Sequence, residues 1–342
     1  MTSVIAGNVP EIWQTAGVEG LHVDDIATRN NMDPAKLSRI VRLLANEHMF
    51  KEISPNVFRH NRISATLDTG NSLELIEIHP QAKYNTELGI SSFVALMGDE
   101  SMEASANMSE TLLDSRTAYS NEPTQTAFNR AFQRNADLFE WYKQPENEHR
   151  RSRFNTAMTD AMVFSERISY NVGGGIGTTV LTISSVHRHL CYVVQDTPDT
   201  VDQGVKFWES KQPDALQTGM VQFQKHDFFM PQPVRNASVF ILRCIVHDWS
   251  DRYAIKRIRQ LRDAATPDTQ LLLVEYIIRY TCSNSAELEN IPGAAQADAP
   301  APLLANYGNG AGLDYQLDLE MMVMRNSQER SLTQFIDLLR AG

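Results

Sequence analysis

The stretch "FILRCIVHDWSD" (Phe240–Asp251) joins an apolar run to a group of side chains that could do chemistry. Six of its first seven residues are apolar, which predicts a buried strand that ends at His247. An imidazole titrates near neutral pH, so His247 is a candidate general base. A single histidine beside a strand is more often a structural residue, so the chemical interpretation requires partners for it.

Two glutamates are candidate partners. Glu275 lies near the end of the predicted strand "QLLLVEYII", and Glu329 lies in "NSQERS" before the last predicted helix. Ligands bind beyond the carboxyl ends of the strands in a doubly wound sheet, so His247 and Glu275 are expected to face one crevice. Carboxylates beside an imidazole hold its tautomer and stabilise its protonated form. Each glutamate alone is more often a solvated surface group, and the strand-end position favours Glu275 over Glu329.

A glycine-rich loop, "YNVGGGIGTTV", follows the first strand predicted in this part of the chain. Gly173, Gly174 and Gly175 permit a tight turn and a close approach of a ligand to the backbone. Asp196 ends the next predicted strand about 20 residues later, where a carboxylate can bind both hydroxyls of a ribose. A glycine turn with a surface aspartate is the alternative. The dinucleotide pattern needs a third glycine where this chain has Thr178, which argues against NAD.

The third predicted strand ends in "KHDFF", with Asp227 and Phe228. An acid and an aromatic ring suit the amino group and the face of an adenine. A pyrophosphate often has a basic neighbour, whereas this strand end offers an acid. The pattern favours a cationic adenosine cofactor without phosphate, which is S-adenosyl-L-methionine.

The elements that must position these residues form three parts. We predict a winged-helix-like dimerisation domain over 1–70, a helical linker over 71–166 and a Rossmann-like catalytic domain over 167–342. From about residue 167, strands such as "RISYNV", "LCYVVQD" and "SVFILRCIV" alternate with helices. This alternation predicts an α/β fold with an open, doubly wound parallel sheet.

The first part shows helices followed by a hairpin. Asp33 is the expected N-cap of the helix "PAKLSRIVRLLAN", and a turn is expected at Ser54–Asn56. Basic residues on that helix leave DNA binding open, but they are spaced like an ordinary solvated face. The net charge of −11 also argues against nucleic acid as the main partner.

The region over 71–166 is helical in pattern and rich in aromatic residues and methionine. Phe132 and Trp141 fit a hydrophobic core, yet we expect some of these side chains to line a substrate pocket. In the last part, Ser331 and Gln334 form an expected capping box.

Composition limits the expected cellular location and the expected metal content of the protein. No apolar run is long enough to cross a bilayer, and no signal sequence is evident. The three cysteines are too few and too scattered to predict a disulfide framework or a metal site, so we expect no metal and a cytoplasmic location.

Together the motifs resemble, in order and spacing, the class I O-methyltransferases of the plant caffeate and fungal polyketide type, closest to fungal members. The resemblance covers nearly the whole chain. Its motifs are "NVGGGIG", "VVQDTPDTV", "HDFFMPQPV", "LRCIVHDWSD", "LLLVEYII" and "DLEMMVM…ERSLTQF".

The resemblance implies a role for each site residue. His247 would be the catalytic base between the acids Glu275 and Glu329. The cofactor contacts implied are Gly173, Gly174 and Gly175 along its length, Asp196 on the ribose, Asp227 and Phe228 on the adenine, and Arg243 and Trp249 nearby. Met321 and Met324 would line the pocket of a small phenolic acceptor. The N-terminal part would form a homodimer and would not bind DNA.

Some features depart from the family pattern. The chain begins at what would be a later helix, the connection before "RISYNV" is short, and the chain ends before two expected strands. Asn171 stands where relatives usually carry an acid. Two alternatives therefore stay open: a homologue that binds the cofactor but catalyses a pericyclic or other non-methylating reaction, and a catalytically impaired homologue that acts as a binding or dimerising partner.

Overall fold

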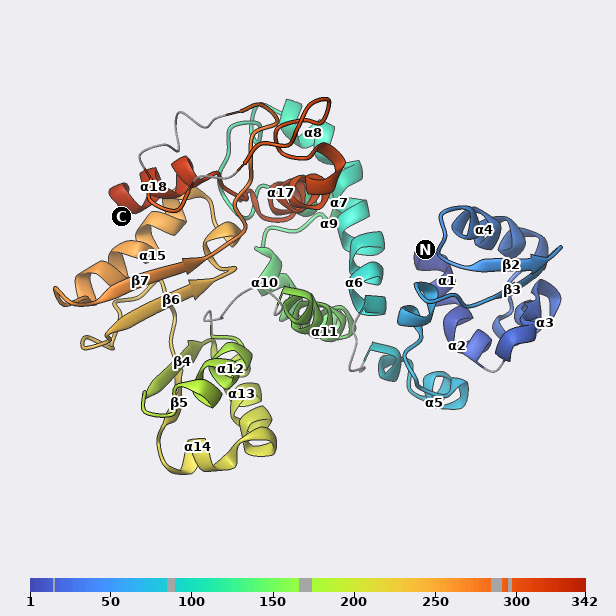
Figure 1. Ribbon diagram of the computed structural model, residues 1–342, viewed down its shortest axis with the longest axis horizontal. Helices are drawn as coiled ribbons and strands as arrows, with labels where there is room; N and C mark the ends of the chain where they lie inside the picture. Colours follow the sequence, from blue (N-terminus) through green and yellow to red (C-terminus); the bar gives the residue numbers. More distant parts are fainter. Residues whose placement is uncertain (15, 85–89, 166–173, 284–290, 295–296) are drawn as a thin grey trace. The chain divides into compact units, whose positions relative to one another are not determined.

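A computed structural model describes residues 1–14, 16–84, 90–165, 174–283, 291–294 and 297–342 (Figure 1). The chain forms two compact units. Unit 1 comprises Met1–Met108 and Arg130–Arg167, and unit 2 comprises Ser109–Asn129 and Ile168–Gly342. The division into 1–70, 71–166 and 167–342 stays a prediction.

Unit 1 is mainly helical. Its elements are α1 (Thr2–Ala6), α2 (Val9–Gln14), η1 (Gly17–Glu19), β1 (Leu21–His22), α3 (Val23–Asn30), α4 (Pro34–Asn46), β2 (Lys51–Ser54), β3 (Val57–Arg59), η2 (Ser64–Leu67), α5 (Leu73–Ile78), η3 (Pro80–Tyr84), α6 (Ile90–Leu96), the π-helical turn η4 (Met97–Ser101), α7 (Met102–Ala106), α10 (Leu138–Tyr142), η5 (Pro145–Asn147) and α11 (Glu148–Ser165). Two helices cross the unit boundary, α8 (Met108–Leu113) and α9 (Ala127–Phe132).

Local sequence signals set the elements of residues 1–70. The carboxylate of Asp33 accepts a hydrogen bond from the backbone N–H of Lys36 at 2.8 Å, which caps α4 as predicted. Strands β2 and β3 form the predicted antiparallel hairpin, and β1 pairs with the other side of β3. Asn56 in the turn has a φ of 63°, a left-handed conformation that asparagine tolerates. The winged-helix assignment itself stays a prediction.

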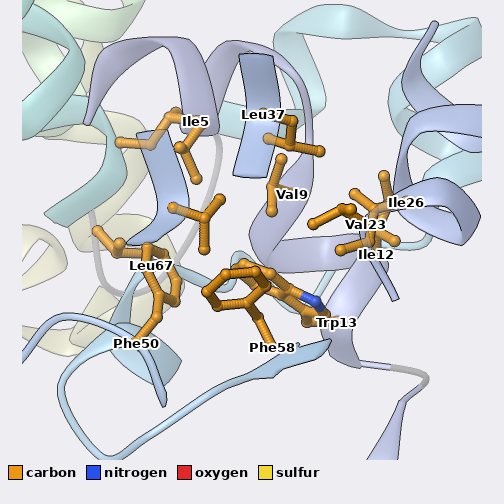
Figure 2. Packing of buried hydrophobic residues seen from close by; sticks show 12 residues of the cluster. Ile5, Val9, Ile12, Trp13, Val23, Ile26, Leu37, Phe50, Phe58 and Leu67 are labelled. Carbon is orange, nitrogen blue, oxygen red and sulfur yellow. The ribbon is translucent and has the colours of Figure 1, made fainter. Parts of the chain in front are cut away.

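These elements enclose one hydrophobic core. Figure 2 shows Trp13, Phe50 and Phe58 beside aliphatic side chains from the helices. The rings of Trp13 and Phe50 lie 4.8 Å apart, centroid to centroid. Full burial of such side chains stabilises a fold by about 1.5–3 kcal/mol each, so this cluster holds the helices on the small sheet.

Unit 2 carries strands and helices in alternation. Besides parts of α8 and α9, its elements are α12 (Thr178–Val186), β4 (Tyr192–Asp196), α13 (Pro198–Lys211), α14 (Pro213–Gln217), β5 (Val221–Lys225), β6 (Val239–Arg243), η6 (Val246–Asp248), α15 (Asp251–Ala264), β7 (Gln270–Val274), η7 (Gly308–Ala311), α17 (Gly312–Arg325) and α18 (Leu332–Ala341).

The strands of unit 2 pair in parallel, as the α/β prediction requires. Strand β4 pairs with β5, so that Asp196 lies opposite Lys225, and β6 pairs with β7, so that Arg243 lies opposite Val274. The described residues thus contain two parallel pairs rather than the one sheet predicted. The predicted first strand, "RISYNV", and Asn171 within it lie outside the described residues.

Helices cover these pairs. Helix α13 packs on β4 and β5, and Trp208 from this helix is fully buried between them and the start of α12. Helix α18 packs along α15 beside β7 (Figure 1). Ser331 and Gln334 form the predicted capping box at the start of α18. Within the described ranges, no helix is both long and apolar enough to cross a membrane.

Candidate functional site

The histidine lies in a short turn between a strand and a helix. Strand β6 ends at Arg243, the turn η6 holds His247, and α15 begins at Asp251. About 15 % of the His247 side chain is exposed, so a ligand can reach the ring while most of it is shielded from water. The abrupt change from apolar to polar sequence is therefore the end of the strand.

Glu275 fixes this turn through its backbone. It directly follows β7, and its Oε1 accepts hydrogen bonds from the N–H groups of Ile245 at 3.0 Å and Val246 at 2.7 Å. The sequence predicted that the carboxylate of Glu275 lies beside the ring of His247. The structure brings the two residues close together, but the carboxylate forms its hydrogen bonds with the backbone. Both of these hydrogen bonds go to the backbone, because the pairing of β6 with β7 brings the glutamate next to the N–H groups of the turn.

Glu329 makes the direct contact with the imidazole. Its Oε1 lies 2.7 Å from Nδ1 of His247, and only 3 % of the residue is exposed. The backbone N–H of Glu329 donates to Asp318 of α17 at 2.8 Å, which fixes the segment between α17 and α18. The glutamate that the sequence favoured less is thus the one that orients the ring.

Arg330 connects this segment to the turn, a role that the sequence analysis missed. It is fully buried, and its guanidinium donates to the carbonyl oxygens of Val246 at 2.9 Å and Trp249 at 2.7 Å. It also donates to Asp251 at the start of α15. A planar guanidinium can satisfy several acceptors at fixed angles, so Arg330 holds both sides of His247 in place. The arginine next to Glu329 in "ERS" was the available signal.

A further acid lies close to the ring. Oδ1 of Asp248 is 3.6 Å from Nε2 of His247 and 3.0 Å from Nη1 of Arg325. Burial alone would lower the pKa of His247, but the negative charges of Asp248, Glu329 and Glu275 outweigh it and raise that pKa to about 9. Burial also raises the pKa of Glu275, against the opposing effects of His247 and the two N–H groups.

The glycine loop lies against the end of β4. The N–H of Gly175 donates to Oδ2 of Asp196 at 2.8 Å. A Cβ atom on Gly174 would overlap the backbone carbonyl of Gln195, so only glycine allows this approach. The structure therefore brings together the loop and the acid that the sequence paired. Gly173 lies outside the described residues.

A cavity of about 180 Å³ lies beside this loop. Gly174, Asp196, His226 and Phe228 line it, together with Arg257 of α15. Nε2 of His226 is buried without a hydrogen-bond partner among the described residues, and burial lowers the pKa of this histidine. A neutral ring with an unsatisfied nitrogen at a cavity can bind a polar ligand. The sequence analysis did not select His226. It directly precedes the predicted cofactor residue Asp227 in "KHDFF", and that position was the signal that could have identified it.

The aromatic side chains that follow β5 already pack against other residues of unit 2. Cζ of Arg257 lies 3.1 Å from the ring centroid of Phe228, so a guanidinium already covers one face of that ring. Trp249 packs edge-on against Phe229, with centroids 4.8 Å apart. Asp227 is exposed, and its Oδ1 accepts a hydrogen bond from the N–H of Phe229 at 2.9 Å. The adenine contacts of these residues stay predictions.

The remaining predicted residues lie in both units. Arg243 is 1 % exposed at the end of β6. Met324 is buried and Met321 half-buried on α17 of unit 2. Phe132 and Trp141 belong to unit 1, where their ring centroids lie 5.0 Å apart and Arg150 lies over both rings. Their predicted role in a substrate pocket stays a prediction.

Comparison with known proteins gives this arrangement a context. Residues 112–291 match the family model described as "O-methyltransferase domain". The chain is 37 % identical over 350 aligned residues to an O-methyltransferase of Armillaria gallica, covering 97 % of this chain and 74 % of that protein. It is 38 % identical to 4-O-methyltransferase 1 of Phanerochaete chrysosporium, covering 99 % of this chain and 75 % of that protein.

A solved structure of LepI in complex with SAM is similar in fold. The TM-score is 0.69 at 16 % sequence identity, and the match covers 100 % of this chain and 80 % of that one. At this identity the likeness concerns the fold, and it agrees with the Rossmann-like α/β architecture predicted from the sequence.

Proposed function

The chain belongs to the O-methyltransferase family and uses S-adenosyl-L-methionine, and from that premise we propose that it methylates a hydroxyl of a small phenolic metabolite with His247 as the general base. The observation that carries the proposal is the contact between Glu329 and Nδ1 of His247. With Nδ1 engaged, Nε2 is the nitrogen left to take a proton.

The described residues fit the cofactor. Gly174 lets the loop lie directly against the end of β4, and it lines the cavity beside Asp196. Asp196 lies beside the same loop and offers carboxylate oxygens to ribose hydroxyls. The unpartnered nitrogen of His226 lines the adjoining cavity and can meet a polar group of the nucleoside. We assign these residues to the cofactor, with Asp227, Phe228, Arg243 and Trp249 as further contacts.

When bound, S-adenosyl-L-methionine supplies an electrophilic methyl group on a positively charged sulfur. A phenol has a pKa of about 10 and is mostly protonated near pH 7, so its oxygen needs a base. His247 removes that proton, and the carboxylates of Glu329 and Asp248 stabilise the imidazolium that results. Glu275 and Arg330 hold the turn, so the base stays at a fixed position relative to the acceptor.

The acceptor class rests on the base and on the relatives. A base with a pKa of about 9 is matched to a phenol rather than to an alcohol, whose proton is far less acidic. The name of the relative 4-O-methyltransferase 1 specifies which oxygen is methylated. For this chain we propose only that the acceptor group is a hydroxyl. Met321 and Met324 of α17 would contribute apolar side chains to the acceptor pocket.

We also propose that the protein acts as a cytoplasmic homodimer. The proposal rests on the family resemblance of residues 1–70. Exposed apolar side chains in that part support the proposal. Val18 and Leu43 are 71 % and 63 % exposed, and burying them against a second copy would remove apolar surface from water.

Isotope-labelled cofactor and a panel of phenols test the reaction. We expect labelled methyl ether from the wild-type protein and a fall in kcat of about 10²–10⁴-fold in His247→Asn, because asparagine cannot take the proton. His189→Asn is the matched control, since His189 is exposed in the same unit. Isothermal titration should show that both variants bind the cofactor as the wild type does.

The outcomes separate the alternatives. If the wild-type protein bound neither the cofactor nor its demethylated product, methyl transfer would be abandoned. A product of unchanged mass, formed while the cofactor is not consumed, would point to a non-methylating reaction. Full activity in His247→Asn would exclude this histidine as the base.

A further inference from the structure

A thiol lies beside the proposed base, and the methyl-transfer chemistry does not use it. Cys244 directly follows β6, and its N–H donates to the carbonyl oxygen of Val274 at 3.0 Å. Its φ of 48° is left-handed, a conformation that a residue with a Cβ seldom adopts. In this conformation, one donor atom each of Cys244, His247 and Glu275 lies within 4.8 Å of the donor atoms of the other two.

His247 and Glu275 each offer a ligand atom that is not used in the hydrogen bonds described above. Nδ1 of His247 is engaged by Glu329, which leaves Nε2, whose neighbour is Oδ1 of Asp248 at 3.6 Å. Oε1 of Glu275 accepts both backbone hydrogen bonds, while its Oε2 is buried without a hydrogen-bond partner in the described parts of the chain. A buried carboxylate oxygen without a partner is costly, so a cation would stabilise it.

We propose that Cys244, His247 and Glu275 bind a soft divalent cation of the Zn²⁺ type, and that this metal blocks the site by occupying the base. Sulfur, imidazole nitrogen and carboxylate oxygen are the ligands that Zn²⁺ takes, at about 2.0–2.3 Å. Zinc-ligating histidines almost always donate their second ring nitrogen to a carboxylate or carbonyl, and Glu329 already occupies that position on His247. A water molecule would complete a tetrahedral site.

The sequence alone did not indicate this site. Metal motifs are recognised by close spacing along the chain, and the three cysteines are scattered. Here the pairing of β6 with β7 brings Glu275 next to a residue 31 positions earlier in the chain.

The binding step balances as a proton exchange. Cysteine binds a metal as its thiolate, and histidine binds through an unprotonated ring nitrogen. The metal replaces the proton of the thiol and, starting from the imidazolium, the proton on Nε2 of His247. Both protons pass to solvent as the metal–sulfur and metal–nitrogen bonds form. Affinity therefore rises with pH. The inhibitory consequence rests on the proposed function, because a metal on Nε2 removes the base and competes with the acceptor.

Cobalt serves as a spectroscopic probe for the site. The test protein is the reduced double variant Cys191→Ser/Cys282→Ser, in which Cys244 is the remaining cysteine. We expect Co²⁺ to produce a thiolate-to-metal charge-transfer band and Zn²⁺ to abolish it. Adding Cys244→Ser should remove the band. No substrate is needed, so this result does not depend on methyl transfer.

Inhibition is then measured in the same variants, each relative to its own metal-free rate. Adding Cys244→Ser should raise the Zn²⁺ concentration for half-inhibition by about tenfold or more, and Mg²⁺ should not inhibit. Absence of the cobalt band, or its persistence after Cys244→Ser, would overturn the site. A cobalt band without zinc inhibition of an active enzyme would overturn the blocking role. A band in a protein without methyl transfer would retain the site and refute the proposed function.

Discussion

At the scale of single residues, the position of the proton on His247 decides the chemistry. Glu329 engages Nδ1, and the negative charge around the ring raises its pKa to about 9. The free site thus holds an imidazolium at neutral pH, and only the small neutral fraction can accept a proton. The same acids that stabilise the product of proton transfer limit how much base is available.

A pH profile follows from this pKa. Below about pH 9 the neutral fraction of His247 grows about tenfold per pH unit, so kcat/KM should rise with pH and level off near that value. A phenol ionises near pH 10, so the limb must be assigned to the enzyme with a variant. In Glu329→Gln one negative charge is lost and the pKa of His247 falls, so the limb should move to lower pH.

Glu209→Gln is the matched control, because Glu209 is an exposed glutamate on α13, and it should leave the profile in place. A limb that stays at the same pH in Glu329→Gln would contradict the assignment to His247. The plateau in Glu329→Gln should also fall, since a weaker base transfers the proton less readily.

At the scale of elements, the turn η6 is held from two directions. Glu275 fixes its backbone N–H groups from the end of β7, and Arg330 fixes its carbonyl groups from the segment before α18. Backbone groups buried in such a turn need partners, and here two charged side chains supply them. The proposed base is therefore positioned by the residues that hold its turn as well as by contacts of its own ring.

Arg330→Lys tests this positioning role. Lysine keeps the charge but cannot reach both carbonyl groups and Asp251 in one plane, so the turn should shift. We expect kcat to fall by about 10²-fold, because small misplacements of a catalytic group have effects of that size. The KM for the cofactor should stay unchanged, as measured by steady-state kinetics.

Arg259→Lys provides the comparison, since Arg259 on α15 is exposed and donates to the carbonyl oxygen of Ala341 at 2.9 Å, away from the turn η6. Equal losses in kcat and in cofactor affinity in Arg330→Lys would indicate general unfolding instead of a displaced base. Thermal denaturation of both variants monitors that possibility.

At the scale of the whole molecule, each unit has its own core. Unit 1 buries the cluster around Trp13 and Phe58, and unit 2 buries separate clusters around Trp208 and around Phe335. The proposed base, its acids and the glycine loop all belong to unit 2. Residues 1–70, to which the resemblance assigns dimerisation, belong to unit 1.

A measured mass tests the homodimer. The chain has a mass of 38.6 kDa, so light scattering coupled to size exclusion should give about twice that value. Leu43→Glu would place a charge on the exposed apolar surface of residues 1–70 and should lower the mass, while Leu113→Glu, outside that part, should not. A mass of one chain for the wild type would contradict the proposal.

The sequence by itself determined the features that depend on neighbouring residues. The cap at Asp33, the capping box at Ser331 and the strand end at Asp196 were predictable, because helix caps and strand ends use side chains within a few positions of the backbone groups they satisfy. The family motifs likewise gave His247, Glu275 and Glu329 as one group, although they lie far apart in the chain.

Only the tertiary structure decided what each of these residues contacts. Glu329 reaches the imidazole across 82 positions, Glu275 turns to the backbone, and Arg330 links two elements that no local pattern joins. Cys244 approaches both His247 and Glu275 for the same reason. These contacts depend on how strands pair and helices pack, and that packing is a property of the whole folded unit, because residues that are distant in sequence must first be brought together.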